Sequence, residues 1–316
     1  MAGTIIMPKL GRMGRWGNSI FQYAFLRTYA RRHNLRYECP AWVGQVLYGH
    51  HDPPLTGARL PKIIEKTIHG ANDAIIPNLT RPLSNVSCEG YFQYHTSYYR
   101  PDETFIRDLF RPAPRIKDAL SPALARLRAS GSQRIGIHLR RGDQGVKWFY
   151  LTPLCWYHDW LLKYWPTFTN PSLFVCSDDR EAYKEFLEWR PMTTPQLDAK
   201  LPQDLYRGYN HLQYEFTNGV ADFYPDHYLL SQCDVILFGA TTFGFTAAML
   251  AQSKQHWRSN PRTQQFEQLD PWDSSPLDMT IDVKDFGHIP GIRMTPDDVR
   301  KFHGPQAAEI LKSWSC

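Results

Sequence analysis

The first forty residues predict a strand, a glycine-containing loop, a helix and a second strand. Thr4–Met7 is a short apolar run, and a glycine-rich stretch follows it. Apolar residues then recur at the spacing of one helix face over Ser19–His33. Asn18 and Ser19 have side chains suited to capping the start of that helix. Leu35–Cys39 resembles the second strand.

The second half of the chain repeats a pattern in which an apolar run of strand length leads into a polar turn. Such runs occupy Arg134–Arg140, Leu173–Cys176 and Asp234–Phe238, and the last feeds a predicted helix over Phe245–Gln252. Strands that alternate with helices are typical of an α/β fold with a mainly parallel sheet.

The stretch between these halves is less regular. Residues 40–88 are rich in Pro, Gly and His and show weak periodicity, whereas Gly90–Tyr94 is an aromatic, strand-like patch. Short helices are predicted over Phe105–Phe110 and Ile116–Ala129, with a stop at Gly131. A chain of 316 residues suits two domains, which we expect to divide into residues 1–131 and 132–316.

Polar clusters follow the three strands of the second half. They are His138–Asp143, Ser177–Asp179 and Ala240–Gly244. Ligands of parallel α/β sheets bind beyond the carboxyl ends of the strands. The sequence therefore predicts a ligand site where these clusters meet.

Arg140 and Arg141 suggest the chemistry of that site. Guanidinium groups bind phosphate oxygens in a bidentate manner, and a Thr/Gly turn that opens a helix offers N–H groups to an anion. Together they describe a clamp for a diphosphate. The alternative is a structural network in which the two arginines pair with Asp143, Asp178 or Asp179. Because successive strand residues face opposite ways, we expect only one arginine to face the ligand.

Composition and charge narrow the choice of partner. A formal net charge of +5 is a mild excess that suits an anionic small molecule and does not require nucleic acid. Aromatic residues reach 14% of the chain, and aromatic rings line sugar-binding pockets as well as cores. Because many of them fall in Tyr91–Tyr99, Trp148–Trp160 and Tyr206–Tyr228, we expect them to line a cleft for sugars.

Other patterns give expectations about metals, redox state and membranes. Adjacent carboxylates such as Asp178–Asp179 are weak evidence for a divalent ion, and capping of a helix by Ser177 or Asp178 is the favoured role. His50–Asp52 fits no standard metal-binding spacing, so no metal is expected. The six cysteines are scattered and are expected to be reduced, buried thiols. Cys233–Ala251 has the length of a membrane span but includes Asp234, so a buried strand and helix are expected there. With no apolar leader at the start, we expect a cytoplasmic protein with at most peripheral contact with the inner membrane face.

Six blocks of sequence, in order along the chain, resemble glycosyltransferase family 11, the α-1,2-fucosyltransferases of bacterial type. Gly14–Ala24 (GRWGNSIFQYA) is similar to the family's opening block, and Gly90–Gln93 together with Phe105–Phe110 is similar to its second. His138–Asp143 (HLRRGD) matches an H-x-R-R-G-D motif that α-1,6- and protein O-fucosyltransferases share. The remaining blocks are Phe174–Asp179, Asp226–Cys233 and Ala240–Leu250.

The resemblance implies a fold and a reaction. The fold would be GT-B-like, with two facing Rossmann-like domains, the first on the acceptor side and the second holding a GDP-sugar. The reaction would be an inverting transfer of L-fucose from GDP-β-L-fucose to the 2-OH of a terminal galactose, on an oligosaccharide or a glycolipid-linked glycan. The family's enzymes need no metal or other cofactor.

The resemblance also implies roles for individual residues. Arg140 would bind the β-phosphate and assist the departure of GDP, with Arg141 close by. Asp143 is the candidate base, or else it orients the arginines while the departing phosphate takes the proton. The other implied donor-binding residues are His138 and Asp226 at the guanine, Thr241, Thr242 and Phe243 at the pyrophosphate, Ser177 and Asp178 near the donor, and Asn18 at the β-phosphate or the acceptor.

Three positions depart from the family pattern. Ser19, Ala240 and Gly244 stand where the family has Gln, Asn and Ser. Two alternatives therefore stay open: a transferase that uses another GDP-sugar or another acceptor hydroxyl, and a catalytically inactive protein that binds a nucleotide or a carbohydrate.

Overall fold

The computed structural model describes residues 3–65, 74–141, 151–206, 221–253 and 255–277. The chain forms two compact units. Unit 1 comprises Met1–Pro122, Ala199–Pro225 and Pro271–Leu277, and the described part of unit 2 comprises Ala123–Asp198 and Asp226–Asp270. The chain thus returns twice to unit 1 after Pro122. A single boundary at residue 131 does not describe these returns, because it places both of them in the second domain.

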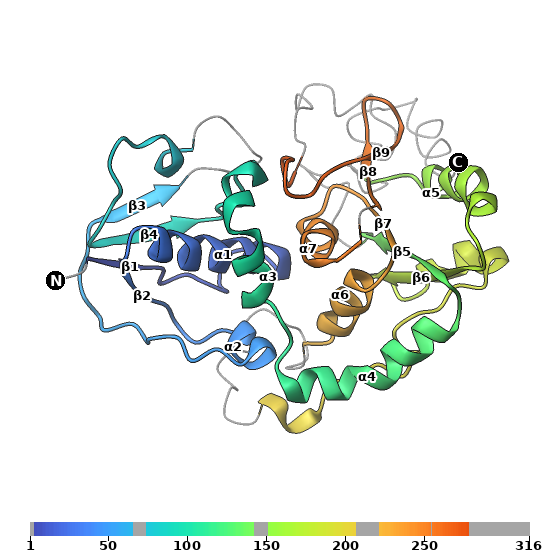
Figure 1. Cartoon of the computed structure of the whole chain (residues 1–316), viewed down its shortest axis with the longest axis horizontal. Coiled ribbons are helices and arrows are strands. Elements are labelled where there is room, and N and C mark those ends of the chain that lie inside the picture. The colour runs from blue at the N-terminus through green and yellow to red at the C-terminus, as the bar shows by residue number, and fades with distance from the viewer. Residues whose placement is uncertain (1–2, 66–73, 142–150, 207–220, 254, 278–316) are drawn as a thin grey trace, which may run out of the picture. The chain divides into compact units, whose positions relative to one another are not determined.

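Unit 1 is built on a parallel sheet of four short strands in the order β2-β1-β4-β3 (Figure 1). The strands are β1 (Thr4–Ile6), β2 (Arg36–Glu38), β3 (Lys62–Glu65) and β4 (Val86–Gly90). Strand β4 ends at Gly90, so the expected strand over Gly90–Tyr94 is wrong. Phe92 has a φ of 53°, and this left-handed conformation does not continue a strand.

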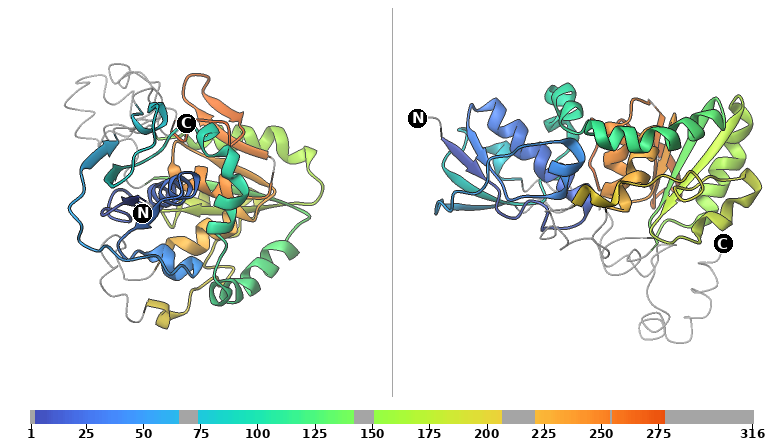
Figure 2. Two further views of the ribbon diagram at one scale, coloured as in Figure 1. Left: turned by 60° about the vertical axis from the view of Figure 1, so that its left-hand side comes forward. Right: turned by 90° about the horizontal axis from the view of Figure 1, so that it is seen from below.

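The long helix α1 (Trp16–Arg32) packs against the sheet of unit 1 (Figure 2). Its N-cap is Arg15, which makes no side-chain capping bond, so the expectation that Asn18 and Ser19 cap the helix is wrong. Both lie inside its first turn, because the helix begins at Trp16. The other helices of this unit are α2 (Val43–Tyr48), α3 (Glu103–Leu109), the 3₁₀ helices η1 (Ile76–Asn78), η2 (Thr96–Tyr98), η3 (Arg100–Asp102) and η6 (Gln203–Tyr206), and the first half of α4 (Pro114–Ala129).

Unit 2 contains a sheet in the order β6-β5-β7-β8-β9. Its strands are β5 (Gln133–Leu139), β6 (Pro171–Ser177), β7 (Val235–Phe238), β8 (Gln255–Asn260) and β9 (Gln265–Gln268). All neighbours are parallel except β8 and β9. The helices are α5 (Leu154–Tyr164), α6 (Phe223–Ser231), α7 (Thr242–Leu250), η4 (Trp165–Thr167) and η5 (Ala182–Trp189), with α6 starting in unit 1. The expected α/β class with parallel sheets is confirmed.

The alternation of side chains along β5 divides the core of unit 2 into two faces. Ile135, Ile137 and Leu139 pack in one buried cluster with Trp156 and Tyr157 of α5. The intervening Gly136 faces α6 instead, because a Cβ there would lie 2.8 Å from a methyl carbon of Leu230. Side chains at odd-numbered positions of β5 therefore face α5, and those at even-numbered positions face α6 and α7.

The aromatic residues mostly fill cores. Tyr94 and Tyr99 are buried in unit 1, and Trp156, Tyr157 and Trp160 are buried in unit 2. The expectation that these rings line a cleft for sugars is therefore wrong for these five. Large rings bury more apolar surface than other side chains, and this explains why they gather there.

The cysteines of the described residues divide into two groups, and Cys316 lies outside those residues. Cys39, Cys88, Cys176 and Cys233 are free and buried, as expected. Cys155 is disulfide-bonded, so the expectation of a reduced thiol is wrong for this residue. Among the described residues, no helix is both long and apolar enough to cross a bilayer.

Candidate functional site

The three polar clusters lie at the carboxyl edge of one sheet, as the sequence predicted. Strand β5 is flanked by β6 and β7, with His138 opposite Cys176 on one side and opposite Phe238 on the other. On one side of Arg140, Ser177 ends β6 and Asp178 follows it, and on the other side Thr241 comes after the end of β7. Because all three strands run in the same direction, their polar ends meet at one edge.

Asp178 binds both arginines. Its Oδ2 lies 2.8 Å from Nη1 of Arg140, and its Oδ1 accepts a hydrogen bond of 2.7 Å from the main-chain N–H of Arg141. The side chain of Arg140 is 16% exposed and that of Asp178 is 24% exposed, so this pair is only partly open to water. A guanidinium carries several N–H donors, so the contact with Asp178 does not by itself exclude a second anion. The structural network and the clamp are thus compatible.

Arg141 points to the opposite face of the sheet. Its Nη1 donates to the carbonyl oxygen of Thr152 at 3.0 Å, and burial lowers its pKa, partly offset by Tyr157 and Asp178. The Thr152 hydroxyl lies 2.9 Å from the Ser259 hydroxyl in the interior. Arg140 and Arg141 therefore bond different parts of the protein, and the expectation that a single arginine faces a ligand stays a prediction.

His138 lies buried beside the first turn of α7. Its ring stacks on Phe243 with centroids 4.7 Å apart, and His227 meets the same ring edge-on at 5.0 Å. Burial lowers the pKa of His138 to about 4, against an opposing effect of Asp178. Its Nδ1 is buried and has no hydrogen-bond partner within the described part of the chain. A neutral imidazole with an unused ring nitrogen can accept from or donate to a ligand.

Thr241 is the N-cap of α7. Its hydroxyl accepts the main-chain N–H of Phe243 at 3.1 Å, so that amide is already committed within the protein. Thr242 and Phe243 are half-buried in the first turn, where the positive end of the helix dipole favours an anion. Gly244 is required by packing, because a Cβ there would lie 2.4 Å from Cβ of Phe238.

Asp226 lies in the first turn of α6 and accepts a hydrogen bond from the Thr194 hydroxyl. Burial raises its pKa to about 7, while Thr194 and Arg180 act in the opposite direction. A carboxyl group with a pKa near 7 carries part of a proton at neutral pH. Such a shift is frequent at functional sites.

Asn18 belongs to helix α1 of unit 1. Its Oδ1 accepts a hydrogen bond of 2.5 Å from Nε2 of Gln93. The preceding loop has left-handed backbone at Gly14, where a Cβ would lie 1.9 Å from Nδ2 of Asn18. Gln22 holds the loop from within the helix, because its amide donates to the carbonyl of Met13 at 3.0 Å.

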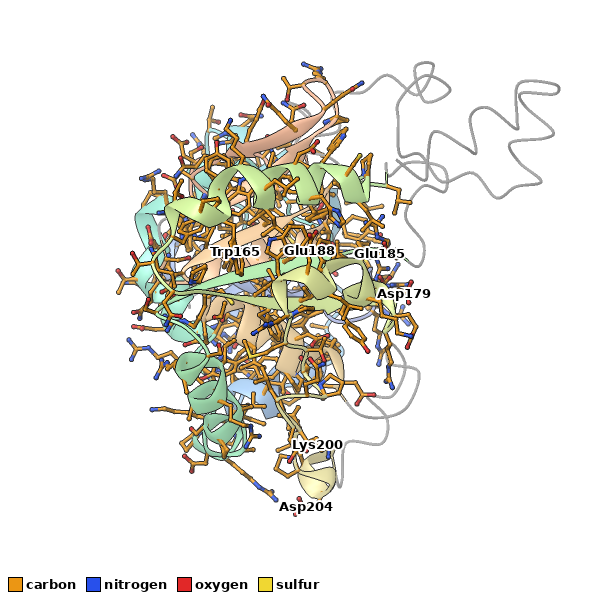
Figure 3. All side chains as sticks on the ribbon, turned by 90° about the vertical axis from the view of Figure 1, so that its right-hand side faces the viewer. Trp165, Asp179, Glu185, Glu188, Lys200 and Asp204 are labelled. Carbon is orange, nitrogen blue, oxygen red and sulfur yellow. The ribbon has the colours of Figure 1, made fainter. Side chains whose placement is uncertain are left out.

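The remaining predicted residues are Asp143, Ser177 and the neighbouring Asp179. Asp143 lies outside the described residues. The Ser177 hydroxyl accepts the N–H of Asp179, and the Asp179 carboxylate accepts the N–H of Glu181 at the start of the turn before η5. Figure 3 places Asp179 on the surface, on the same side of the unit as Glu185 and Glu188. No group of three or more potential metal ligands occurs among the residues that the structure describes.

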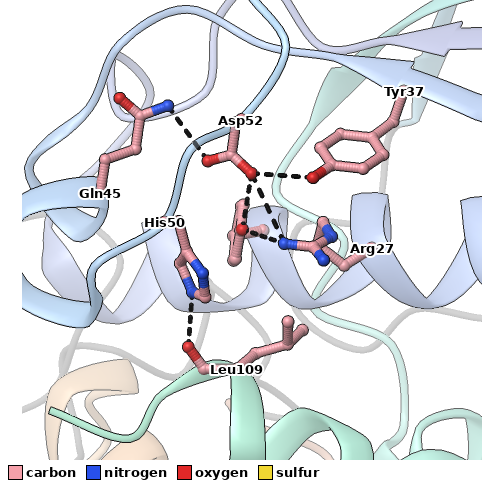
Figure 4. Close-up of polar contacts among 7 residues, drawn as sticks. Arg27, Tyr37, Gln45, His50, Asp52 and Leu109 are labelled. Carbon is pink, nitrogen blue, oxygen red and sulfur yellow. Dashed lines mark hydrogen bonds and ion pairs between the residues drawn. The ribbon is translucent and has the colours of Figure 1, made fainter. Parts of the chain in front are cut away.

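His50 and Asp52 belong to a separate buried network in unit 1 (Figure 4). Asp52 accepts hydrogen bonds from Tyr23 at 2.8 Å, from Tyr37 at 3.1 Å and from the amide of Gln45 at 3.1 Å. The His50 ring bonds a carbonyl of α3 instead. The carboxylate is saturated by neighbouring donors, so this motif fixes the loop after α2 to α1 and β2.

Several residues at the site were not predicted from the sequence. Thr152, Tyr157, Thr194 and His227 all contact a predicted site residue. His227 had a signal because it directly follows Asp226, and Tyr157 had one because it lies in the aromatic-rich range Trp148–Trp160. The others come from stretches with no motif. Their contacts depend on chain folding over long separations.

Comparisons with known proteins support the fold. No protein-family model matches the chain, and no curated protein matches its sequence. The structure is similar to the NodZ α-1,6-fucosyltransferase co-crystallised with GDP, with a TM-score of 0.57 and 12% identity over 85% of this chain and 99% of that one. Fucosyltransferase NodZ from Bradyrhizobium matches with a TM-score of 0.53 at the same identity and coverage. A mutant of FUT1 from Arabidopsis thaliana in complex with GDP matches at a TM-score of 0.55 and 14% identity over 85% of this chain and 74% of that one. The chain therefore has the GT-B-like α/β fold of these fucosyltransferases.

Proposed function

We propose that this protein transfers L-fucose from GDP-β-L-fucose to the 2-OH of a terminal galactose, with inversion and without a metal ion. The observation that carries the proposal is Arg140, which Asp178 holds at the carboxyl end of the central strand β5. The fold is shared with fucosyltransferases crystallised with GDP or GDP-fucose. The six ordered sequence blocks supply the choice of family 11.

In the proposed reaction, the C–O bond between fucose and the β-phosphate breaks as the acceptor hydroxyl attacks from the opposite face. Negative charge then grows on the departing diphosphate. Arg140 stabilises that charge, because a preorganised donor is most effective where charge develops. Asp143 takes the acceptor proton, or it orients the arginines while the departing phosphate takes that proton.

The donor would lie along the edge formed by β5, β6 and α7. His138 and Asp226 would contact the guanine. The Thr241–Phe243 turn would contact the pyrophosphate through its hydroxyls, because the N–H groups of Thr241 and Phe243 are bonded within the protein. Arg141 is assigned a supporting position, because its side chain bonds Thr152 on the other face of the sheet. Asn18 is assigned to the β-phosphate or to the acceptor.

The test is to incubate the full-length protein with GDP-fucose and lactose and to measure GDP release and the fucosylated product. NMR of the product assigns the linkage and the anomeric configuration. Activity is expected to persist after EDTA treatment, and a loss that Mn²⁺ restores would contradict the metal-independent reaction. No product with a range of galactosides, despite GDP binding, would favour a nucleotide-binding protein without transferase activity.

A second linkage is a genuine alternative. The similar NodZ structures are of an α-1,6-fucosyltransferase, and the match at 12% identity supports the fold but not the hydroxyl that is modified. Departures at Ser19, Ala240 and Gly244 are a reason to include other GDP-sugars in the same assay. A product whose NMR spectrum shows an α-1,6 linkage would select the alternative.

A further inference from the structure

Thr194 links the loop beyond η5 to α6. Its hydroxyl donates a hydrogen bond to Oδ1 of Asp226, although the two residues are 32 positions apart in the sequence. Because threonine has few rotamers and a short side chain, it offers a better defined donor than a long side chain would.

The backbone on both sides of Thr194 is fixed. Before it, Met192 bridges to β6, where its N–H donates to the carbonyl of Leu173 at 2.8 Å and its carbonyl accepts the N–H of Val175 at 2.8 Å. After it, the side-chain oxygen of Gln196 accepts two hydrogen bonds from Thr193, one from its main-chain N–H at 2.8 Å and one from its hydroxyl at 3.1 Å. The position of the Thr194 hydroxyl is thus set by β6 and by a local turn.

We propose that Thr194 is a positioning residue that orients the Asp226 carboxylate for reading the base of the donor nucleotide. This inference rests on the proposed function and adds a determinant of base specificity to it. Asp226 touches the base, and Thr194 acts through Asp226.

The chemistry of guanine fits this arrangement. Guanine presents two adjacent N–H donors, N1–H and the 2-amino group, which match the two oxygens of a carboxylate. Thr194 occupies one acceptor position of Oδ1, whereas Oδ2 of Asp226 has no hydrogen-bond partner in the described residues. Each carboxylate oxygen has more than one acceptor position, so both can still receive a donor from the base. Hypoxanthine, the base of IDP, lacks the 2-amino group and would therefore donate a hydrogen bond to only one of the two carboxylate oxygens.

Neighbouring groups determine when Asp226 is ionised. The Arg180 guanidinium and the Thr194 hydroxyl favour the carboxylate, while burial disfavours it. The adjacent His227 is neutral at physiological pH, because burial lowers its pKa to about 3, and burial keeps the Cys176 thiol protonated by raising its pKa. Removal of the Thr194 hydroxyl therefore removes one of the two groups that favour the charged form.

The experiment is calorimetric titration of the full-length protein with GDP and IDP between pH 5.5 and 8.5. Thr194→Val is expected to weaken GDP binding about tenfold at pH 7, as for the loss of a hydrogen bond to a charged group. It should also reduce the preference for GDP over IDP and move the pH midpoint of GDP binding upwards. Thr194→Ser keeps a hydroxyl and should restore the GDP affinity, the preference for GDP over IDP and the pH midpoint of the wild type. Thr193→Val, which alters the neighbouring threonine but not Asp226, is the matched control.

The outcomes separate this inference from the proposed function. If Thr194→Val binds GDP with the affinity, base preference and pH midpoint of the wild type, the positioning role is overturned while donor binding stands. If Thr193→Val has the same effect as Thr194→Val, both substitutions act by disturbing the conformation of the loop, and the positioning role is again overturned. A wild-type protein that binds no GDP at any pH would overturn the proposed function and this role together.

Discussion

The Asp178 carboxylate lies 2.8 Å from the guanidinium of Arg140. The same carboxylate accepts the main-chain N–H of Arg141, so it fixes the direction in which the chain leaves β5 as well as the arginine side chain. A partly exposed arginine that is held in this way has a defined position at the sheet edge.

Replacement of Arg140 tests its proposed role at the diphosphate. Arg140→Lys keeps the charge but loses the planar fork, and we expect turnover with GDP-fucose to fall at least a hundredfold, with Arg140→Ala near a thousandfold. Initial rates of GDP release measure the effect. The matched control is Arg134→Lys at the other end of β5, where Arg134 pairs with Asp234. Equal losses in the two lysine variants would argue against a special role for Arg140.

The two adjacent aspartates allow a paired comparison. Asp178→Asn weakens the contact that holds Arg140 and should lower turnover about tenfold, whereas Asp179→Asn affects only a turn N–H and should change it little. The readout is kcat at saturating donor, with circular dichroism as a check on folding. A larger effect at Asp179 would contradict the assignment.

Acid stability should depend on His227. In the unfolded chain its pKa is near 6.5, and in the folded protein burial lowers its pKa to about 3. The unfolded state therefore binds more protons between these values, and His227 makes the protein less stable as the pH falls below about 6.5. His227→Gln should remove up to about 1.4 kcal/mol of that loss per pH unit.

Urea unfolding at pH 7.5, 6.0 and 5.0 measures this difference. Asp226 has the opposite effect, because a folded-state pKa raised to about 7 makes the protein more stable as the pH falls, but it is present in both proteins and cancels in the comparison. His51→Gln, at an exposed histidine, should leave the pH dependence unchanged. A His227→Gln curve parallel to that of the wild type would contradict the prediction.

The buried Asp52 network should matter for stability rather than for the nucleotide. Tyr37→Phe removes a donor at 3.1 Å from the carboxylate and should destabilise the protein by about 1–3 kcal/mol. Affinity for GDP should not change, because the network belongs to unit 1. Tyr164→Phe is the control, since its hydroxyl has no hydrogen-bond partner in the described ranges. A loss of GDP binding in Tyr37→Phe without a loss of stability would show that the network has another role.

The sequence predicted the strand ends of unit 2 well, for a physical reason. Buried parallel strands are continuous apolar runs, and the polar residues that follow them must lie at one edge of the sheet. His138, Asp178 and Thr241 were therefore placed together correctly. The predicted helix over Phe245–Gln252 begins three residues earlier in the structure, because Thr241 provides the cap.

Other features could not be predicted from local pattern. After β6, the spacing of Tyr183, Phe186 and Leu187 is typical of one face of an α-helix, but the segment forms the 3₁₀ helix η5 with a kink at Phe186. Strand β3 gave no signal, because Lys62–Glu65 is short and contains only two adjacent apolar residues. Contacts such as Thr194 with Asp226 join stretches that no local rule connects.

The interleaving of the two units limits how the protein can be divided. The part of unit 2 described here comes from Ala123–Asp198 and Asp226–Asp270, with a stretch of unit 1 between them. No single truncation yields that part alone, and a chimaera that replaces the described part of unit 2 needs junctions on both sides of Ala199–Pro225. Recombination between relatives would therefore exchange Asp226 and its hydrogen-bond partner Thr194 as one unit only if both segments moved together.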